Sequence, residues 1–434
     1  MLVIVDYGSQ YTQLIARRVR ARRVYCEIVP CSAPVEEVLQ RQPKGIILSG
    51  GPARVNAQGA PQVDRRLLDA GLPVLGICYG LQGMVRVLGG EVEGREREYG
   101  AATMKVAVRD GLFDGLPQES RVWMSHGDRV VALPDGFEAM GKTDGSEFCA
   151  VRHRERALFG LQFHPEVVHT EFGEKILENF AFRVCGEEPT WDMGSFIVRE
   201  TERLREETSG RRVVCAVSGG VDSTVLATLV HRALGERFHG VFVDNGLLRK
   251  GEADEVMERF RRLVGVPIEK IEAQKKFLGA LRGIEDPEEK RRRIGRIFVK
   301  VLLEQLGPDD LLAQGTLYPD VIESVSAYGP SATIKTHHNR VTEILELAKT
   351  GRVVEPLRGL FKDEVREVGK TLGIPDEVLW RHPFPGPGLA IRIIGEVTAD
   401  RLELLREADA IFIEELKRSG LYEKTWQAFA VLLP

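Results

Sequence analysis

A cysteine, a histidine and a glutamate with the chemistry to open an amide bond stand in the first half of the sequence. Cys78 lies in LPVLGICYGLQ, where an apolar run turns into a helical pattern between two glycines. A nucleophile on such a sharp turn projects from a sheet, and the helix N-terminus favours its thiolate. His164 and Glu166, in LQFHPE, follow another apolar run, so the imidazole can take the thiol proton and the carboxylate can orient the imidazole.

A third motif favours catalysis over the alternative of a structural, buried cysteine. LSGGP ends another predicted strand with Gly50 and Gly51, whose backbone amides can meet a developing oxyanion. Three strand ends therefore predict acyl transfer.

A second candidate site lies in VVCAVSGGVDST. An apolar run stops at two glycines and continues as a helix, which builds an anion-binding nest of amides and hydroxyls. The lysine of a mononucleotide P-loop is missing, so Asp222 and the hydroxyls suit a metal-bridged pyrophosphate better. The alternative is an ordinary glycine turn.

Further along, LAQGTLYPDVIES places Asp320 and Glu323 three residues apart on one helix turn, where both can hold Mg²⁺. Lys335 in IKTHHN and Lys362 in LFKDEV supply cations that can offset charge on a transferring phosphoryl group. A surface acidic pair and two exposed lysines are the alternatives.

The elements that must position these residues alternate between short apolar runs and helical patterns. This alternation predicts an α/β fold with two doubly wound, mostly parallel sheets in tandem. We place a first domain at 1–187, a second at 188–382, and the start of a truncated α+β domain at 383–434. Ligands are expected at the carboxyl ends of the strands.

Bulk composition excludes several classes of protein. The net charge of −4 argues against a general nucleic-acid or membrane binder, and no apolar stretch reaches the roughly 18 residues of a bilayer span. The basic runs 16–23 and 290–293 are interpreted as solvated helix faces.

The N-terminus lacks the features of a signal peptide, which predicts a cytoplasmic protein. The six cysteines show no zinc-ligand spacing, so most are expected to be buried thiols.

The motifs of residues 1–185 resemble the class I glutamine amidotransferase family. The resemblance implies that Cys78 attacks the glutamine side-chain amide, forms a glutamyl thioester and releases ammonia, with His164 and Glu166 completing a triad. It also implies that glutamine is held by a group of residues around the elbow and in MSHGD: Gly50, Gly51, Tyr79, Gln82, Ser125 and His126.

SGGVDST resembles the pyrophosphate loop of N-type ATP pyrophosphatases, which cut ATP between its α and β phosphates. The resemblance implies ATP binding by the loop, by the strand that follows it and by the glycine of LAQGT, namely Ser218, Gly219, Gly220, Val221, Asp222, Ser223, Thr224, Val243 and Gly315.

Over nearly the whole chain the order of motifs is similar to the glutamine-hydrolysing GMP synthase family. This implies amination of xanthosine 5′-monophosphate (XMP) to GMP with glutamine and ATP, Mg²⁺ as cofactor, no tightly bound organic cofactor, and a homodimer. EDPEEKRRRIGR resembles a mobile lid of that family, with Arg291 over the substrate phosphate or the ATP.

The sequence departs from the family pattern in two places, and two other functions are considered as alternatives. Residues 340–355 differ from the family's glycine-rich loop, and the sequence stops at Pro434 before the family's nucleotide-binding tail. If that tail is absent, glutamine hydrolysis and ATP binding are expected to survive and GMP formation to be weak. SGGxDS loops also serve tRNA thiolation and the syntheses of NAD, asparagine and argininosuccinate. A non-catalytic regulatory protein is the alternative from another class, and intact Cys78, His164 and Glu166 argue against it.

Overall fold

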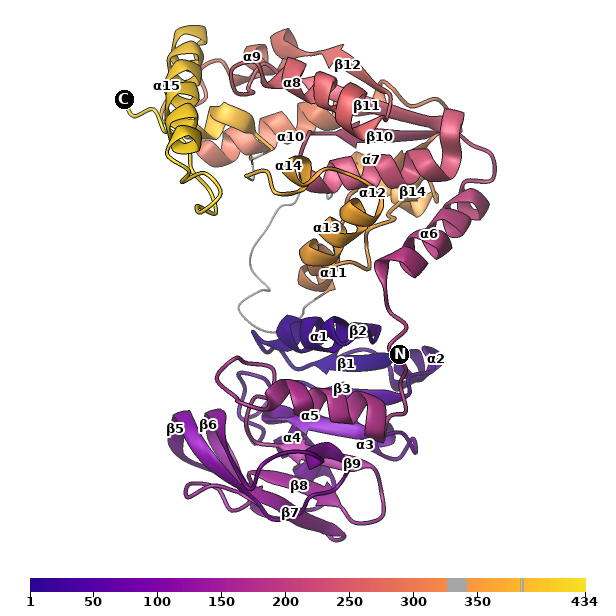
Figure 1. Ribbon diagram of the computed structural model, residues 1–434, viewed down its shortest axis with the longest axis vertical. Coiled ribbons are helices and arrows are strands. Elements are labelled where there is room, and N and C mark those ends of the chain that lie inside the picture. The colour runs from indigo at the N-terminus through magenta and orange to yellow at the C-terminus, as the bar shows by residue number, and fades with distance from the viewer. Residues whose placement is uncertain (326–341, 383, 385) are drawn as a thin grey trace. The chain divides into compact units, whose positions relative to one another are not determined.

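The protein is represented by a computed structural model that describes residues 1–325, 342–382, 384 and 386–434 (Figure 1). The described chain divides into two compact units. The first comprises Met1–Asp192 with 319–325, and the second comprises Met193–Tyr318 with the remaining described residues.

Within the described residues, the nine strands of the first unit form one sheet in the order β2-β1-β3-β4-β9-β8-β7-β5-β6. The part from β2 to β9 is parallel, and the part from β9 to β6 is antiparallel. The strands are β1 (Leu2–Asp6), β2 (Cys26–Pro30), β3 (Gly45–Leu48), β4 (Val74–Ile77), β5 (Glu91–Val106), β6 (Glu119–Ala132), β7 (Phe137–Lys142), β8 (Ala150–His153) and β9 (Leu158–Leu161).

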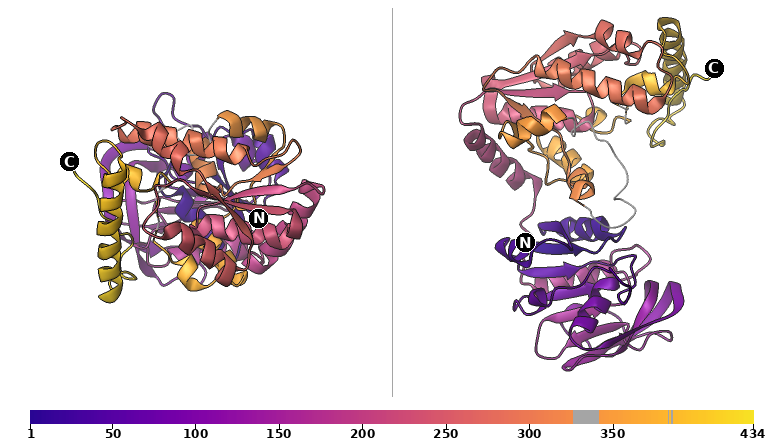
Figure 2. Two further views of the ribbon diagram at one scale, coloured as in Figure 1. Left: turned by 90° about the horizontal axis from the view of Figure 1, so that it is seen from above. Right: turned by 180° about the vertical axis from the view of Figure 1, so that it is seen from behind.

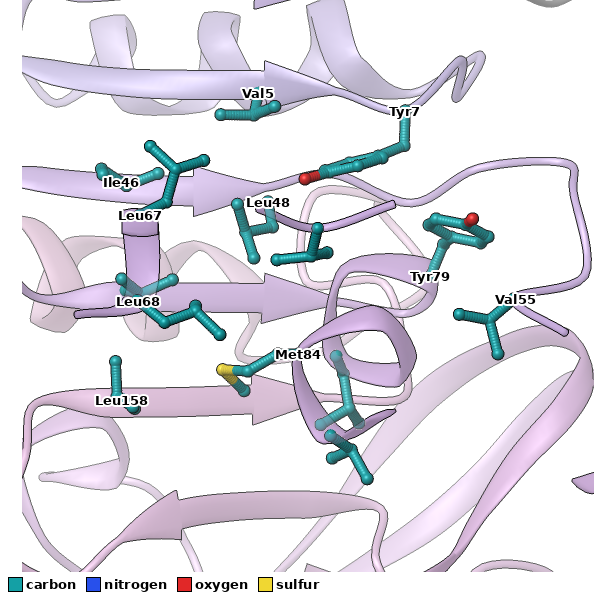
Figure 3. Close-up of a cluster of buried hydrophobic side chains, with 14 of the residues drawn as sticks. Val5, Tyr7, Ile46, Leu48, Val55, Leu67, Leu68, Tyr79, Met84 and Leu158 are labelled. Atoms are coloured by element: carbon teal, nitrogen blue, oxygen red, sulfur yellow. The ribbon is translucent and has the colours of Figure 1, made fainter. Parts of the chain in front are cut away.

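Strands β1, β3, β4 and β9 are buried on both faces, which explains their continuous apolar runs. Figure 3 shows part of the core, where Tyr7 and Tyr79 lie near each other at the strand ends and Met84 of α4 packs over the sheet. The helical segments are α1 (Thr12–Ala21), α2 (Val35–Gln40), α3 (Arg65–Leu68), α4 (Tyr79–Val87), η1 (Gly111–Phe113), α5 (Gly173–Asn179) and η2 (Phe180–Val184).

The second unit is built on a parallel sheet, five-stranded in the described chain, with the order β12-β11-β10-β13-β14. Helices cover both faces of this sheet, as the views in Figures 1 and 2 show. Its strands are β10 (Val213–Val217), β11 (Phe238–Asp244), β12 (Ile268–Glu272), β13 (Leu311–Ala313) and β14 (Val353–Val354).

Among the helical segments after Asp192, α10 has a start that the local sequence explains. The Asp286 carboxylate accepts a hydrogen bond from the backbone of Glu289, and Pro287 occupies the first helical turn. The segments are α6 (Met193–Thr208), α7 (Val221–Leu234), η3 (Gly235–Arg237), α8 (Glu252–Arg259), η4 (Phe260–Val264), α9 (Gln274–Leu281), α10 (Pro287–Leu303), α11 (Tyr318–Val325), α12 (Thr342–Lys349), α13 (Lys362–Thr371), α14 (Asp376–Leu379), η7 (Gly388–Arg392) and α15 (Ala399–Arg418).

The predicted α/β class with mostly parallel sheets is confirmed. None of the helices that the structure describes combines the length and apolar composition needed to span a bilayer. The six cysteines all fall within the described residues and are free thiols, of which five are buried.

The prediction that both basic runs are solvated helix faces is wrong for two of their members. Arg20 is buried and lies over the rings of Tyr25 and Trp191. Lys290 is fully buried because it shares the inward face of α10 with Ile294, four residues on.

Candidate active site

Cys78 occupies a strained turn between β4 and α4. Its φ of 51° and ψ of −103° lie in a region that residues other than glycine rarely adopt. The flanking glycines make the turn possible, because a β-carbon on Gly76 would lie 2.7 Å from the Leu81 nitrogen and one on Gly80 would lie 2.3 Å from the Leu48 carbonyl oxygen. The thiol therefore stands at the N-terminus of α4, where the helix dipole favours a thiolate.

His164 and Glu166 form a buried hydrogen-bonded pair beside this turn. The Nδ1 atom of His164 lies 2.7 Å from Oε1 of Glu166, and both side chains are almost completely buried. Burial acts to lower the pKa of His164, but the Glu166 carboxylate and the interaction with the Cys78 thiol outweigh it and hold that pKa well above its ordinary value. With Nδ1–H donated to Glu166, Nε2 is the ring nitrogen left to exchange a proton with the thiol.

The loop that carries His164 is fixed by contacts from neighbouring segments. The Thr170 hydroxyl donates to the His164 carbonyl at 2.6 Å and accepts from the Trp123 backbone at 3.1 Å. The backbone N–H of His164 donates to the Trp123 carbonyl at 3.1 Å. These bonds join the loop to β6 and leave the imidazole little freedom to move.

Gly50 and Gly51 lie against the same turn, where Gly50 leaves little room for a side chain and Gly51 leaves none. A β-carbon on Gly50 would come within 3.2 Å of Cε1 of His164 and 3.8 Å of Cβ of Cys78. A β-carbon on Gly51 would lie 2.7 Å from the Tyr7 carbonyl oxygen. The backbone after β3 thus passes directly beside the nucleophile and the base.

The residues expected to hold glutamine are positioned in different ways. Ser125 presents its carbonyl, which accepts from the Cys78 thiol at 3.6 Å, and Gln82 donates to the Asp128 carbonyl at 2.6 Å. The Tyr79 side chain is buried in the core, with its hydroxyl donating to the Pro61 carbonyl at 2.5 Å. Any contact of Tyr79 with glutamine therefore falls to its backbone.

His126 is buried, and it faces Glu98 across the β5–β6 pair. Its Nε2 atom lies 3.3 Å from Oε2 of Glu98. Burial lowers the pKa of His126, and the Glu98 carboxylate opposes this effect only in part. The neutral form of the His126 imidazole is therefore favoured, whereas the protonated form is favoured at His164.

The sequence interpretation missed two polar residues at this site. Gln162 is fully buried, with Nε2 at 3.9 Å from the Cys78 sulfur. Glu98, in β5, brings its carboxylate to His126. The only sequence signal for a role of Gln162 was the presence of a polar residue within an otherwise apolar run.

The glycine turn after β10 is organised by its own hydroxyls. The Ser223 hydroxyl accepts from the Ser218 backbone at 3.1 Å and lies 3.0 Å from the Ser218 hydroxyl. Gly219 has φ of +74°, and a β-carbon there would lie 2.5 Å from a methyl group of Val256. Only glycine fits this position, because the backbone is left-handed and α8 packs directly against it.

A cavity of about 510 Å³ opens beside this turn at the carboxyl ends of the strands. Its volume lies within the range of small-molecule sites, and most of the ATP-binding residues expected from the sequence line it. They are Ser218, Gly220, Val221, Asp222, Ser223, Val243 and Gly315.

Lys362, the first residue of α13, also lines the cavity and reaches the turn. Its Nζ atom lies 2.5 Å from each carboxylate oxygen of Asp222. A helix that begins 140 residues after Asp222 thus places a cation beside the turn.

Other expected residues lie elsewhere. Gly219 does not line the cavity, and Thr224 is buried beneath the turn with its hydroxyl donating to the Gly220 carbonyl at 2.8 Å. Arg291 is paired with Glu288 on α10 and is not among the described residues that line the cavity.

The remaining candidates concern the metal and the phosphoryl group. Asp320 lies in α11 and is grouped with the first unit, whereas the Glu323 side chain and the whole of Lys335 lie outside the described residues. Residues 340 and 341 of the segment that departs from the family pattern also lie outside them.

Mg²⁺ fits the donor chemistry of the cavity. In the part of the chain that the structure describes, no three His, Cys, Asp or Glu side chains cluster as a metal cage. Mg²⁺ in nucleotide sites is instead held by one or two carboxylates together with phosphate oxygens, and the Asp222 carboxylate lines the cavity.

Comparison with known proteins gives a match to the family Glutamine amidotransferase class-I over residues 3–184. Three curated relatives are each called GMP synthase [glutamine-hydrolyzing]. The protein of Aquifex aeolicus is 52% identical over 439 residues, which cover 100% of this chain and 85% of the relative. Those of Thermobifida fusca and Carboxydothermus hydrogenoformans are 53% and 50% identical, with 100% and 99% of this chain and 84% and 85% of each relative covered.

The identity to these relatives extends over the whole chain, whereas the glutamine amidotransferase match covers residues 3–184 alone. The chain belongs to the family of glutamine-hydrolysing GMP synthases.

Proposed function

We propose that the chain makes GMP from XMP, with glutamine as nitrogen donor and with cleavage of ATP to AMP and pyrophosphate. The observation that carries this proposal is the identity of about half of all residues to curated glutamine-hydrolysing GMP synthases along the whole chain. The buried cysteine–histidine–glutamate cluster and the cavity beside the glycine turn support it, since glutamine hydrolysis and ATP cleavage each need a site of this kind.

In the glutamine half, the Cys78 thiolate attacks the side-chain amide carbon of glutamine. Protonated His164 gives its proton to the departing nitrogen, so that ammonia leaves and a glutamyl thioester remains. Water, activated by the same imidazole, then releases glutamate. Glu166 holds Nδ1–H of His164 throughout and stabilises the imidazolium, as their 2.7 Å separation allows.

The oxyanion of each tetrahedral intermediate needs backbone donors next to the sulfur. Gly50 and Gly51 pass beside Cys78 without side chains, and the Tyr79 backbone begins the helix that follows the nucleophile. We assign the oxyanion site to this backbone. Gln82, Ser125 and His126 complete the surroundings of the bound glutamine.

In the nucleotide half, we assign the β and γ phosphates of ATP to the Ser218–Ser223 turn and the adenosine to the edge formed by Val243 and Gly315. The XMP carbonyl oxygen attacks the α phosphorus, and pyrophosphate leaves. Ammonia then adds to the purine carbon that carries the adenylate, and AMP departs. Asp222 would hold Mg²⁺, with Asp320 and Glu323 as further candidates, and the ion would offset phosphate charge when bound.

Lys362 is the lysine that we expect to offset charge on the transferring group, together with Lys335. In the structure its ammonium is engaged by Asp222. Arrival of phosphates and Mg²⁺ gives both groups new partners, so the pair can separate without either charge remaining unpaired. Arg291, on α10, is proposed to reach the substrate phosphate or the ATP.

We further propose domains at 1–187, 188–382 and from 383 onward, and a homodimer formed through the last of these. The large apolar side chains exposed on α15 and after it support a second copy as the occupant of this surface, among them Leu404, Ile411, Phe412, Trp426 and Leu433. A sedimentation mass of one chain at micromolar concentration contradicts this part of the proposal.

The experiment that tests the function supplies XMP, ATP and Mg²⁺ with either glutamine or ammonium chloride. We expect GMP, AMP and pyrophosphate in equal amounts with both nitrogen sources. With Cys78→Ala, only the ammonium reaction should remain. Glutamine hydrolysis without GMP from either nitrogen source contradicts the synthase function and leaves a glutaminase alone.

A further inference from the structure

A half-buried arginine from the proline-rich segment contacts the glycine turn and lines the same cavity. Arg381 precedes His382 in RHPFPGPGL, and only 13% of its side chain is exposed. Its Nη1 atom donates to the Gly219 carbonyl at 3.4 Å, and its Nη2 atom donates to Oε1 of Glu252 at 2.5 Å. None of the sequence motifs assigned Arg381 or Glu252 a role.

Glu252 holds the arginine from the start of α8. Its side chain is 3% exposed, and its second oxygen accepts the backbone N–H of Arg249 at 3.0 Å. Arg249 in turn pairs with the buried Asp409 of α15 at 2.9 Å. Side-chain and backbone contacts of these four residues therefore connect the glycine turn with the C-terminal helix.

The contact with the Gly219 carbonyl fixes the direction of a backbone donor. The carbonyl of Gly219 and the N–H of Gly220 belong to one planar trans peptide and point in opposite directions. Holding the oxygen on the Arg381 side directs the Gly220 N–H to the other side, where it now donates to the Ser218 hydroxyl at 3.3 Å. Gly219 and Gly220 have no side chains to resist a flip of this peptide, so the Arg381 contact adds to the Ser218 bond in holding its orientation.

We propose that Arg381, held by Glu252, is a positioning residue that keeps the Gly219–Gly220 peptide oriented so that the Gly220 N–H faces the pyrophosphate portion of ATP. This inference rests on the proposed ATP site. Two N–H groups of Arg381 are directed to protein oxygens, so the proposed role is to hold the turn, although the side chain also lines the cavity.

The substitution Arg381→Lys tests the proposal with little risk to folding. A lysine keeps a positive charge beside Glu252, but its single ammonium lacks the planar fork that reaches two acceptors at once. We expect thermal unfolding of this variant within a few degrees of the unmodified chain. Affinity for magnesium pyrophosphate and for MgATP should fall about tenfold, the typical effect of one charge-assisted hydrogen bond.

AMP is the ligand that separates positioning of the turn from general damage to the cavity. AMP lacks the two phosphates assigned to the turn, so its affinity should change less than twofold in Arg381→Lys. Calorimetric titrations with AMP, pyrophosphate and ATP, each in the presence of Mg²⁺, measure all three constants. Arg261→Lys, in an exposed pair with Glu258 of the same unit, is the matched control and should change none of them.

Wild-type pyrophosphate affinity in Arg381→Lys overturns the proposal, and so does an equal loss of AMP affinity. If that variant does not fold, Glu252→Gln decides in its place, with the same expected pattern and the same contrary outcomes. Failure of the unmodified chain to bind pyrophosphate contradicts both the ATP site and this inference. Binding by the unmodified chain with no loss in the variants contradicts the inference alone.

Discussion

The two candidate sites differ in how complete they are in the structure. At the cysteine site, Cys78, His164 and Glu166 are all buried, and the imidazole already interacts with both partners. At the glycine turn a cavity of about 510 Å³ lies open, and Lys362 and Asp222 are engaged with each other.

The difference follows from what each site must do. A covalent nucleophile acts on a small amide, and misplacing it by about 1 Å can cost 10²-fold in rate, so its geometry is built into a strained turn. A nucleotide site must admit several negative charges and a cation, so its own charges are held in pairs that a ligand can replace. Substitutions in the two sites should show that the cysteine site is preformed and that the nucleotide site is completed by its ligands.

Cys78→Ala is expected to have the largest effect. Without the sulfur no thioester forms, and glutamine hydrolysis should fall by on the order of 10⁴-fold or more. GMP formation with ammonium chloride should be retained, because the nucleotide half does not use the thiol. Glutamate release and GMP formation measured on the same sample check both statements, and Cys215→Ala, a buried thiol of the nucleotide half, serves as the control. Equal glutamine turnover in Cys78→Ala contradicts the assignment of the nucleophile.

Lys362→Met should act on the nucleotide half alone. Loss of a cation directed at a transferring phosphoryl group typically costs about 10²-fold or more in rate, and the freed Asp222 carboxylate adds repulsion toward phosphate. The rate of GMP formation with ammonium chloride should therefore fall by about that factor, whereas glutamine hydrolysis assayed without nucleotides stays at the wild-type rate. Lys370→Met, at the end of the same helix, is the control. A wild-type rate in Lys362→Met shows that the pairing with Asp222 is structural only.

Gly50→Ala tests how precisely the cysteine site is preformed, because it adds one methyl group beside His164 and leaves the catalytic side chains in place. The added methyl would lie 3.2 Å from Cε1 of His164, so either the imidazole or the backbone must shift by a few tenths of an ångström. We expect kcat for glutamine hydrolysis to fall about tenfold with little change in thermal stability. Gly279→Ala, a helical position with open space around it, should leave the rate unchanged. No loss in Gly50→Ala indicates that the site has more freedom than its packing suggests.

The local parts of both sites could be predicted from the sequence. Cys78 and the SGGVDST turn lie where an apolar run meets glycines and a helix begins, and these signals lie within about ten residues. His164 was also within reach, because it follows the end of β9 closely. Such features depend on backbone geometry that neighbouring residues dictate.

Contacts between distant segments could not be predicted in the same way. Lys290 was interpreted as part of a solvated face, yet its ammonium is buried and donates to the carbonyls of Ala390, Ile393 and Gly395. Burial lowers the pKa of this lysine, and the positive charge of Arg401 lowers it further by a smaller amount. Arg381 and Glu252 are 129 residues apart and carry no motif. Which charged side chains become buried depends on how distant helices, strands and loops pack against one another, and composition alone does not contain that information.

The pH dependence of stability should show the smallest effect and the clearest sign. The folded-state pKa of His164 is raised above its ordinary value of 6.5, so its pairing with Glu166 contributes fully below about pH 6.5 and is lost as pH rises through the folded value. Glu166→Gln removes the carboxylate that raises this pKa. The difference in free energy of unfolding between the unmodified chain and Glu166→Gln should therefore be largest in mildly acidic solution and shrink toward alkaline pH. Urea denaturation at a series of pH values measures it, with Glu174→Gln, an exposed carboxylate of the same unit, as the control. A difference that grows with pH would mean that the imidazole at this site is neutral when folded, and the proton that leaves with ammonia would then have to come from another group.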